Sequence, residues 1–502
     1  MMMILAISAL ATLAVTLGYL AYDIIVKRNP LLTYRNMFLV GYLFFYGLAT
    51  LFAVRFEFSG ELYTPVGTGY LPLAVMIPGF LVVFFTGHAW ARKWGWPGKL
   101  IPALELPVTT PALVTYIVIL LAVSSLGLIA VTSYAGGIMT QMRPGLAAAA
   151  IGLATYLLLA KRFNPLAWAI FIPTFVFGVL LSVSGGTDRR FVLGCFIVVL
   201  WVWYWCDLRF RPLGTTLLKL GVIVAIATAF IIVYSGIRHV GEDRLNFANR
   251  AKQLATAATD PTVKKGSLDQ VLYQDAPINT VYIIETYPKD NDLDPFNGLK
   301  FFLGNPIPRF LWPDKPVGLG YALQQQFNIP ANLGPGIIGH GWSEGMWLGV
   351  AGYAIVFGIL TGIMDRLLRE RSWNPYFLAV YGGFLGNFFG LSRGETSLFM
   401  VLIVTGGVGC IVVLWIGKIA LGKFLGAFVP LTYTPPGLGA TPYGASEGDG
   451  NDWQSASNGA WGGGGYGDPY QGSLEGSGAA GSYGYDSSPV ASDAALPSPR
   501  TN

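Results

Sequence analysis

The chain carries little charge for its length. Of its 502 residues only 12% are Asp, Glu, Lys or Arg, whereas 53% are hydrophobic and the mean hydropathy is +0.53. A soluble globular protein has about 25% charged residues, so an ordinary soluble domain is excluded. The composition predicts a polytopic membrane protein, most of whose surface faces lipid.

Cysteine is scarce as well. Cys195, Cys206 and Cys410 are the three cysteines, and all lie in apolar runs. Cys195 and Cys206 fall on one predicted helix, about 16 Å apart at 1.5 Å per residue. A disulfide cannot bridge that distance. We therefore predict no disulfide framework and interpret the cysteines as small packing residues.

Nucleotide-binding motifs are absent. The chain has no GxxxxGK[ST] sequence and no GxGxxG placed after a strand. These Gly-rich loops are what cradle the phosphates of ATP or a dinucleotide. Their absence argues against an ATP-driven pump and against an enzyme that uses nucleotide sugars. We predict no cofactor, no metal and no nucleic-acid partner.

Long apolar runs are what the chain does have. A helix needs about 20 residues to cross about 30 Å of hydrocarbon. We count about eleven such runs by this criterion. Their approximate ranges are 3–25, 36–55, 70–90, 112–133, 144–160, 165–183, 191–206, 216–235, 345–364, 375–391 and 396–417. The sequence predicts an all-α membrane bundle.

Basic residues are unevenly divided between the loops. With the N-terminus outside, the loops on the cytoplasmic side carry most of the Lys and Arg residues, and the short outer loops carry Arg55, Arg143, Arg189, Arg190 and Arg393. This is the positive-inside bias, so we predict an outer N-terminus and a cytoplasmic C-terminus. Arg55 and Arg143 stand alone in their segments, and we interpret them as residues that extend to lipid headgroups or pair with a neighbouring carboxylate.

The chain divides into four parts. Residues 1–236 hold about eight spans and 342–420 about three more. Between them, the hydrophilic stretch 237–341 is predicted to fold against the outer face of the bundle, with amphipathic helices at the interface. Residues 430–502 are rich in Gly, Ser and Tyr, which predicts a disordered cytoplasmic tail.

Ionisable residues gather at the predicted outer boundary of the membrane. Charge near hydrocarbon is costly and tends to mark a function. Arginine can grip a phosphate group through paired hydrogen bonds, so the cluster suggests a lipid-linked phosphate or pyrophosphate. The boundary also holds Glu395, to which the sequence assigns no role. The candidate binding residues are Arg189, Arg190, Arg238, Arg244, Arg309, Lys315 and Arg393.

The stretch "GNPIPRFLWPDKPVGLG", residues 304–320, combines four prolines with two of these cations. Proline restricts the backbone, which favours a functional role for Arg309. We expect Trp312 to pack beside a sugar or lipid. Lys315 is open to another interpretation, since it could pair with Asp314 or face headgroups.

His340 and Glu344 lie four residues apart at the start of the next predicted span. On a helix they share a face, so Glu344 could orient the imidazole or itself act as a base. The alternative is a hydrogen-bonded histidine at a helix start.

Taken together, these features resemble the Wzy-type O-antigen and oligosaccharide repeat-unit polymerases, whose architecture the O-antigen ligases share. The resemblance covers about residues 180–400 and rests on three features: "NPIPRFLWPDKP" in a large outer loop, "GPGIIGHGWSEGMWLGVAG" before the next span, and an arginine before the final helix. It implies a GT-C-like, metal-independent glycosyltransferase of the bacterial inner membrane. Donor and acceptor would both be oligosaccharides linked to undecaprenyl pyrophosphate, and a flippase and a chain-length regulator would be partners.

The resemblance also assigns roles to residues. Arg309, Arg238, and Arg189 or Arg190 would hold the pyrophosphate, and His340 would match the loop histidine of the ligases. Gly349 and Gly352 lie on either side of the glycine spacing that the ligases show, which favours a polymerase. A non-enzymatic transporter or scaffold for lipid-linked glycans is the alternative, and the lack of internal repeats argues against it.

Overall fold

The computed structural model describes residues 1–56, 58, 63–100, 104–129, 134–184, 189–237, 247–259, 274–328 and 333–431. In these ranges the regular structure is helical, apart from an isolated β-bridge between Thr109 and Pro430. The predicted tail beyond residue 431 lies outside the described residues, as do Arg238 and Arg244.

Ten helices in the described part of the chain are long and apolar enough to cross a membrane. The second of them, Tyr34–Arg55, consists of α2 (Tyr34–Tyr42), a π-helical turn (Leu43–Leu48) and α3 (Ala49–Arg55). The others are α1 (Met2–Ile25), α4 (Tyr70–Ala91), α6 (Thr110–Ile129), α7 (Tyr134–Ala160), α8 (Pro165–Ser184), α9 (Arg189–Cys206), α10 (Leu213–Ile237), α16 (Gly336–Arg371) and α19 (Thr396–Gly426). The prediction of an all-helical, multi-pass membrane protein is confirmed at this level.

The predicted span 375–391 is not one helix. It is divided into α17 (Pro375–Gly382) and α18 (Leu385–Gly390), each too short to cross a membrane alone. At its start Asn374 donates to the carbonyl of Leu104 at 2.8 Å, and just after its end the carbonyl of Ser392 accepts from the amide of Ile337 at 3.0 Å. Ile337 is the second residue of α16 and Asn374 lies three residues after its end, so the broken segment runs back along α16.

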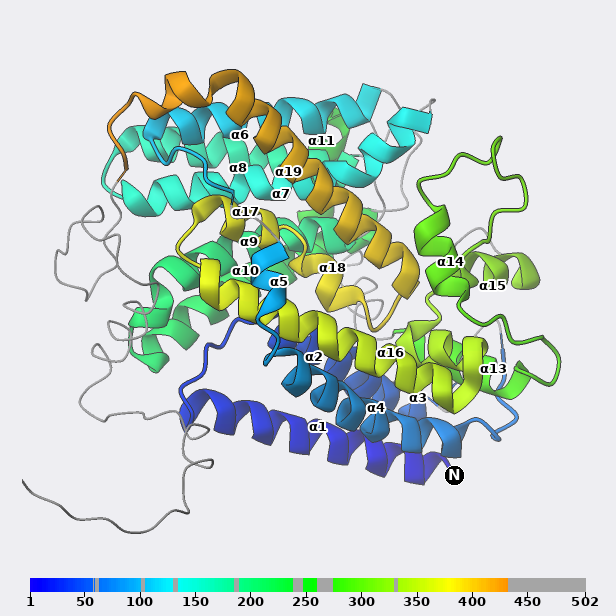
Figure 1. The fold of residues 1–502 in the computed structure, drawn as a ribbon. Coiled ribbons are helices and arrows are strands. Elements are labelled where there is room, and N and C mark those ends of the chain that lie inside the picture. The colour runs from blue at the N-terminus through cyan, green and yellow to red at the C-terminus, as the bar shows by residue number, and fades with distance from the viewer. Residues whose placement is uncertain are drawn as a thin grey trace, which may run out of the picture. The chain divides into compact units, whose positions relative to one another are not determined.

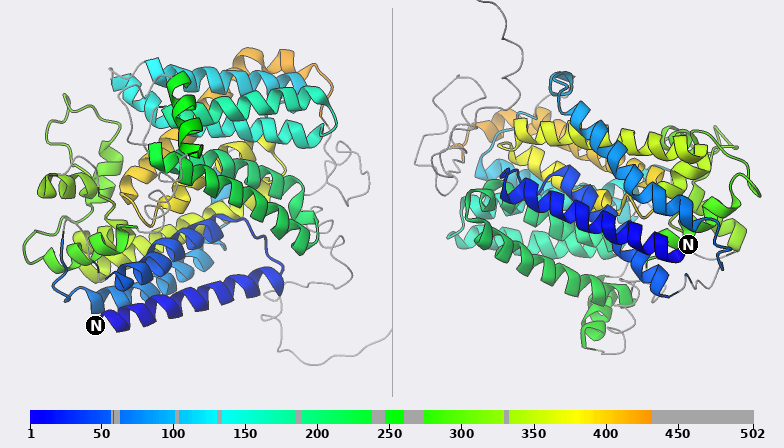
Figure 2. Two further views of the ribbon diagram at one scale, coloured as in Figure 1. Left: turned by 180° about the vertical axis from the view of Figure 1, so that it is seen from behind. Right: turned by 90° about the horizontal axis from the view of Figure 1, so that it is seen from below.

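The helices form two groups, with the broken segment between them (Figure 1). One group comprises α1 to α4, α16 and the short helix α13 (Ala276–Thr286), and the other comprises α6 to α10 and α19. Helix α18 contacts α2 on one side and α9 on the other. Figure 2 shows the same two groups from behind and from below. We call the end of the bundle where α16 begins the site end, and the opposite end the far end.

Small residues allow the second group to pack closely around α7. A Cβ atom at Gly152 would lie 2.9 Å from Ala379 and 3.0 Å from Val198, so only glycine lets α7 approach α17 and α9 this closely. By contrast, α1 and α10 expose large apolar side chains such as Val15 and Leu218. Such a surface is what lipid contact requires.

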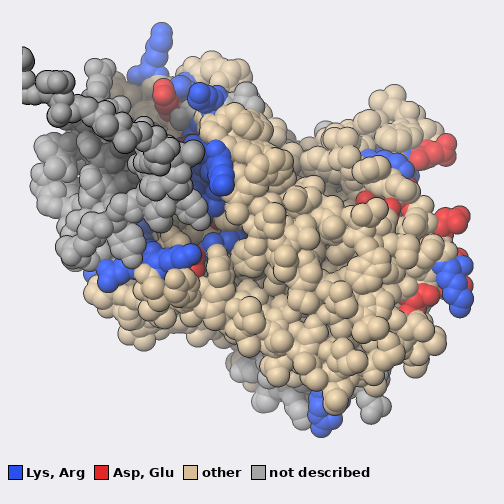
Figure 3. Space-filling model, turned by 60° about the horizontal axis from the view of Figure 1, so that its bottom comes forward, with Lys and Arg blue, Asp and Glu red and all other residues tan. Residues whose placement is uncertain are grey.

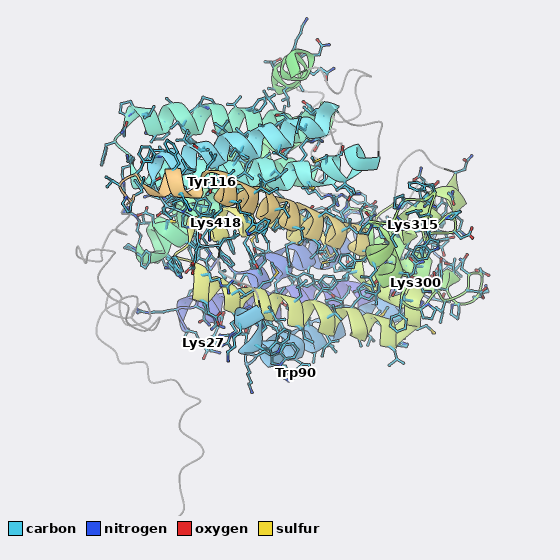
Figure 4. The ribbon with its side chains drawn as sticks, turned by 45° about the horizontal axis from the view of Figure 1, so that its top comes forward. Lys27, Trp90, Tyr116, Lys300, Lys315 and Lys418 are labelled. Carbon is cyan, nitrogen blue, oxygen red and sulfur yellow. The ribbon has the colours of Figure 1, made fainter. Side chains whose placement is uncertain are left out.

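Charged side chains lie mainly toward the two ends of the bundle. On the face shown in Figure 3, each of two opposite ends carries both blue and red atoms, and most of the surface between the two ends is uncharged. Figure 4 places Lys27 and Lys418 toward the far end, and Lys300 and Lys315 at the site end. Lys27 and Lys418, which the charge bias assigns to one side of the membrane, therefore lie toward the same end of the bundle.

Between α10 and α16 the described residues form four short helices: α11 (Phe247–Thr259), α13, α14 (Asn297–Gly304) and α15 (Leu319–Phe327). The expectation of an amphipathic interfacial helix is wrong for α13. All its residues from Ala276 to Ile284 are buried, because the helix packs against α16, α4 and α3. A segment that is apolar on all sides belongs in a core. At the far end, Trp96–Leu100 forms the short helix α5.

Candidate functional site

A histidine bonded to one carboxylate and close to a second lies buried at the site end. Nε2 of His340 lies 2.7 Å from Oε1 of Glu395, and Nδ1 lies 3.7 Å from Oε1 of Glu344. The first contact is a hydrogen bond. The second is too long for one and acts through charge alone. The His340 side chain is only 1% exposed. We call His340, Glu344, Tyr353, Glu395 and Ser397 the His340 centre.

A break in α16 builds part of this centre. Gly345 and Met346 have non-helical backbone angles, and Met346 has a positive φ of 52°. The first part of the helix consequently folds back on the second. A Cβ atom at Gly341 would lie 2.6 Å from Cα of Val350, so the close approach requires glycine at this position. His340 and Glu344 share a face, as their spacing predicts.

Glu395, the residue directly before α19, accepts more hydrogen bonds than Glu344 does. It accepts from the backbone amide of Leu319 at 3.2 Å, from the amide of Gly320, and from Oγ of Ser397 at 2.8 Å. Burial raises the pKa of a carboxyl, but His340 and these hydrogen bonds outweigh it and hold the pKa of Glu395 below its ordinary value. Leu319 and Gly320 are the first two residues of α15, so the carboxylate also caps the N-terminus of this helix, where the helix dipole favours negative charge.

Glu344 has an equivalent position at the other short helix. Its Oε1 accepts from the hydroxyl of Tyr353 at 2.6 Å and from the amide of Gly298 at 2.7 Å. Gly298 is in the first turn of α14, and a Cβ atom there would collide with the Tyr353 hydroxyl. The second carboxylate thus caps the N-terminus of α14.

Together Glu344 and Glu395 fix the position of the segment that runs from α14 to α15. Helices α14 and α15 are joined by residues 305–318, which make up most of the proline-rich stretch. One carboxylate binds the start of each helix, so the pair fixes where the stretch lies. Because His340 is fully buried, a substrate reaches it only when part of the surrounding structure moves aside.

The predicted site residues of the proline-rich stretch have partners outside the centre. Arg309 and Trp312 are exposed, and Trp312 packs beside Gly304 at the end of α14. Lys315 donates from Nζ to the carbonyls of Asn305 at 2.8 Å and Ile307 at 3.2 Å, and not to Asp314. Burial and the neighbouring Arg309 lower the pKa of Lys315. Its contacts close the loop on itself.

Two other predicted arginines lie much nearer to the His340 centre. The guanidinium of Arg190 lies 3.8 Å from the ring centroid of Phe399, one helical turn beyond Glu395. Arg393, two residues before Glu395, pairs with Asp275 at 3.0 Å. Arg189 begins α9 beside Arg190. Of the predicted site residues, the structure therefore groups His340, Glu344, Arg190 and Arg393.

One interpretation of the sequence is wrong. The sequence predicts that Arg143 extends to lipid headgroups or pairs with a neighbouring carboxylate. Its side chain instead lies inside the bundle, is only 1% exposed, and pairs with no carboxylate among the described residues. Arg55, interpreted in the same way, is exposed. The difference arises because α7 is surrounded by other helices, whereas α3 ends at the bundle surface.

Sequence reasoning gave Glu395 no role, although it holds His340 directly. Its position in "LSRGETS", just before the final span, is a usable signal, since an acidic residue at the start of a long apolar helix is favoured by the helix dipole. Nothing local to Glu395 indicates His340 as its partner.

The centre has the groups needed for proton transfer. An imidazole placed between carboxylates can accept, hold and release a proton, and a carboxylate bonded to it fixes the ring orientation. In the described ranges, no group of three or more His, Cys, Asp or Glu residues has an arrangement that could hold a metal ion.

Comparison of the chain with models of known protein families, with curated proteins and with solved structures found no significant match.

Proposed function

We propose that the chain is a membrane glycosyltransferase that joins lipid-linked oligosaccharide repeat units, with its site end outside the cytoplasmic membrane of a bacterium. The observation that carries the proposal is the buried His340, hydrogen-bonded to Glu395 beneath a segment that also presents Arg309. A GT-C-like architecture, implied by the resemblance of the sequence, accords with a catalytic centre at one end of a helical bundle.

The reaction needs a base and a stabilised leaving group. The hydroxyl of the acceptor sugar attacks the anomeric carbon of the donor, its proton passes to the His340 and Glu395 pair, and the bond from the anomeric carbon to the pyrophosphate breaks. The leaving group is the undecaprenyl pyrophosphate anion, which arginines stabilise. The donor arrives activated, so no nucleotide is consumed.

Arginines take the binding role in this proposal. We propose that Arg190, which lies over Phe399, and Arg393, which pairs with Asp275, meet a pyrophosphate bound at the centre. Arg309 would join them when the proline-rich stretch closes over the substrate. Arg189, Arg238 and Arg244 complete the proposed set, with Trp312 beside a sugar. Closure would also keep water from the donor.

Deletion of the gene tests the proposal, with the surface polysaccharide of the cells separated on a gel. A polymerase predicts collapse of a long-chain ladder to single capped repeat units. Full-length glycan left unattached indicates a ligase in its place. An unchanged ladder contradicts both enzymes, and accumulation of lipid-linked glycan on the cytoplasmic side indicates the non-enzymatic transporter.

A further inference from the structure

Arg143 is a buried cation that has no partner among the described residues. Its side chain is 1% exposed, and it makes no hydrogen bond or ion pair with any residue in the described part of the chain. A guanidinium stays charged at any relevant pH. An unpaired charge inside a membrane protein is costly, which points to a partner supplied from elsewhere.

The helices around Arg143 offer no negative charge. Helix α7 packs mainly against α6, α8, α9, α17 and α19. Neither α7 nor any of these five helices contains an Asp or Glu residue, since Glu395 precedes α19. These six helices therefore supply no carboxylate to neutralise the guanidinium.

A second unpaired donor lies at the same level on α8. The hydroxyl of Ser184 is fully buried and has no hydrogen-bond partner among the described residues. Gly178 packs against Ala147 and Ile151. Helices α7 and α8 are consecutive and antiparallel, so counting outward from that contact brings Ser184 level with Arg143.

The depth of Arg143 suits the phosphate of a lipid. Tyr116 of α6 contacts Tyr376 at the far end, so α6 runs toward the site end and α7 begins there. Arg143 is about 14 Å along α7 from its start, at 1.5 Å per residue. Side chains on a helix tilt toward its N-terminus. The guanidinium therefore lies near the level where hydrocarbon gives way to headgroups.

We propose that Arg143 and Ser184 bind a phosphate group between α6, α7 and α8. The planar donor fork of arginine matches two phosphate oxygens, and the serine hydroxyl can donate to a third. A lipid phosphate and free phosphate share this chemistry. The site does not depend on the proposed glycosyl transfer.

Binding is tested on the full chain, purified in a maltoside detergent without phosphate and stripped of lipid. Thermal unfolding is followed with and without inorganic phosphate or dioleoyl phosphatidate, and lipid binding is measured by native mass spectrometry. The variants are Arg143→Met and Arg143→Lys, and Arg55→Met is the matched control because Arg55 is exposed.

Phosphatidate is expected to raise the unfolding midpoint of the wild type and of Arg55→Met, and to leave that of Arg143→Met unchanged. Arg143→Lys should bind at least about tenfold more weakly, because lysine lacks the planar fork. Without ligand, Arg143→Met should be as stable as the wild type or more so. A midpoint raised by inorganic phosphate alone identifies a soluble anion as the ligand.

Three results would overturn the site. One is an equal response of wild type and Arg143→Met to phosphatidate. Another is a wild type that binds neither ligand. The third is an Arg143→Met protein that is less stable than the wild type in lipid-free detergent, which would mean that the chain itself already supplies the partner. An Arg143→Met protein that does not fold counts as this third result. Unchanged phosphatidate affinity of Arg143→Lys contradicts the proposal independently.

Discussion

Nε2 of His340 lies 2.7 Å from Oε1 of Glu395, although the two residues are 55 positions apart in the chain. The contact joins the start of α16 to the residue before α19. It also connects the histidine to the amides of α15, because the same carboxylate accepts from Leu319 and Gly320. Any movement of α15 therefore alters the partner of His340.

Glu395→Gln tests the proton-transfer role. Glutamine keeps the shape but cannot take a proton, and general acid–base catalysis contributes about 10²–10⁴-fold. We expect glycosyl transfer by the reconstituted protein to fall at least about 100-fold. The readout is release of undecaprenyl pyrophosphate.

The control for this variant is Glu370→Gln, an exposed carboxylate at the far end that pairs with Arg366. It should transfer at the wild-type rate. A folded Glu395→Gln protein with unimpaired transfer would remove Glu395 from the mechanism.

Gly298→Ala tests whether the position of α14 affects the activity of the His340 centre. The added methyl group would meet the hydroxyl of Tyr353 and lie 2.9 Å from Oε1 of Glu344, so α14 must shift away. We expect transfer to fall about tenfold, the equivalent of about 1.4 kcal/mol, with little change in the unfolding midpoint. Gly352→Ala is the control, because no atom lies within 4 Å of its added methyl group. Equal activity of the two variants would show that the position of α14 does not affect glycosyl transfer.

Glu285 should make the fold sensitive to acid. It accepts from the amides of Val66, Gly67 and Gly69 at 2.7–3.0 Å and from the Tyr63 hydroxyl. Burial opposes the ionised form, but these hydrogen bonds outweigh it and lower the pKa of Glu285. A lowered pKa stabilises the fold above the unfolded value of about 4.3. That stabilisation is lost as the pH falls through the folded-state pKa.

We therefore expect Glu285→Gln to lower the free energy of unfolding by about 1–3 kcal/mol at pH 7. The difference from the wild type should shrink as the pH falls below about 4. Unfolding midpoints measured across pH 3–8 check this, with the exposed Glu105→Gln as control. A gap that widens in acid would show that the sign is wrong.

Asp365→Asn should destabilise the far end without touching the site. Asp365 binds Nε2 of His88 at 3.1 Å and accepts from the amide of Tyr34 at 2.6 Å, at the start of α2. Losing a hydrogen bond to a buried carboxylate costs about 1.5–3 kcal/mol. The unfolding midpoint should drop, while the transfer rate per folded molecule should stay within about twofold of the wild type, under 0.5 kcal/mol in barrier. An unchanged midpoint would show that the pair contributes nothing to stability.

Arg309→Lys should lose most transfer activity while the protein still inserts. Lysine keeps the charge but lacks the planar fork that grips pyrophosphate. Arg309 is exposed and donates to the Pro313 carbonyl at a long 3.4 Å, so the substitution should leave the unfolding midpoint unchanged. Arg55→Lys serves as the control. Polysaccharide of normal length in cells that carry Arg309→Lys would exclude Arg309 from the site.

The sequence by itself determined the class of the protein and the spacing of its spans. A helix that crosses hydrocarbon must be long and uncharged, which requires a continuous run of apolar residues. Such a run is local, so the sequence alone shows where each span lies. The shared face of His340 and Glu344 is likewise a local property, set by the helical repeat. The charge bias correctly grouped Lys27 with Lys418, because both follow apolar runs of known length.

Only the tertiary structure decided which distant residues meet. The pairing of His340 with Glu395, the burial of Arg143 and the break between α17 and α18 all depend on how helices pack, and packing joins segments that no local pattern relates. Side-chain type could not distinguish Arg143 from Arg55, since each is a lone arginine near a span end. Their surroundings differ because α7 lies at the centre of its helix group, whereas α3 ends at the surface.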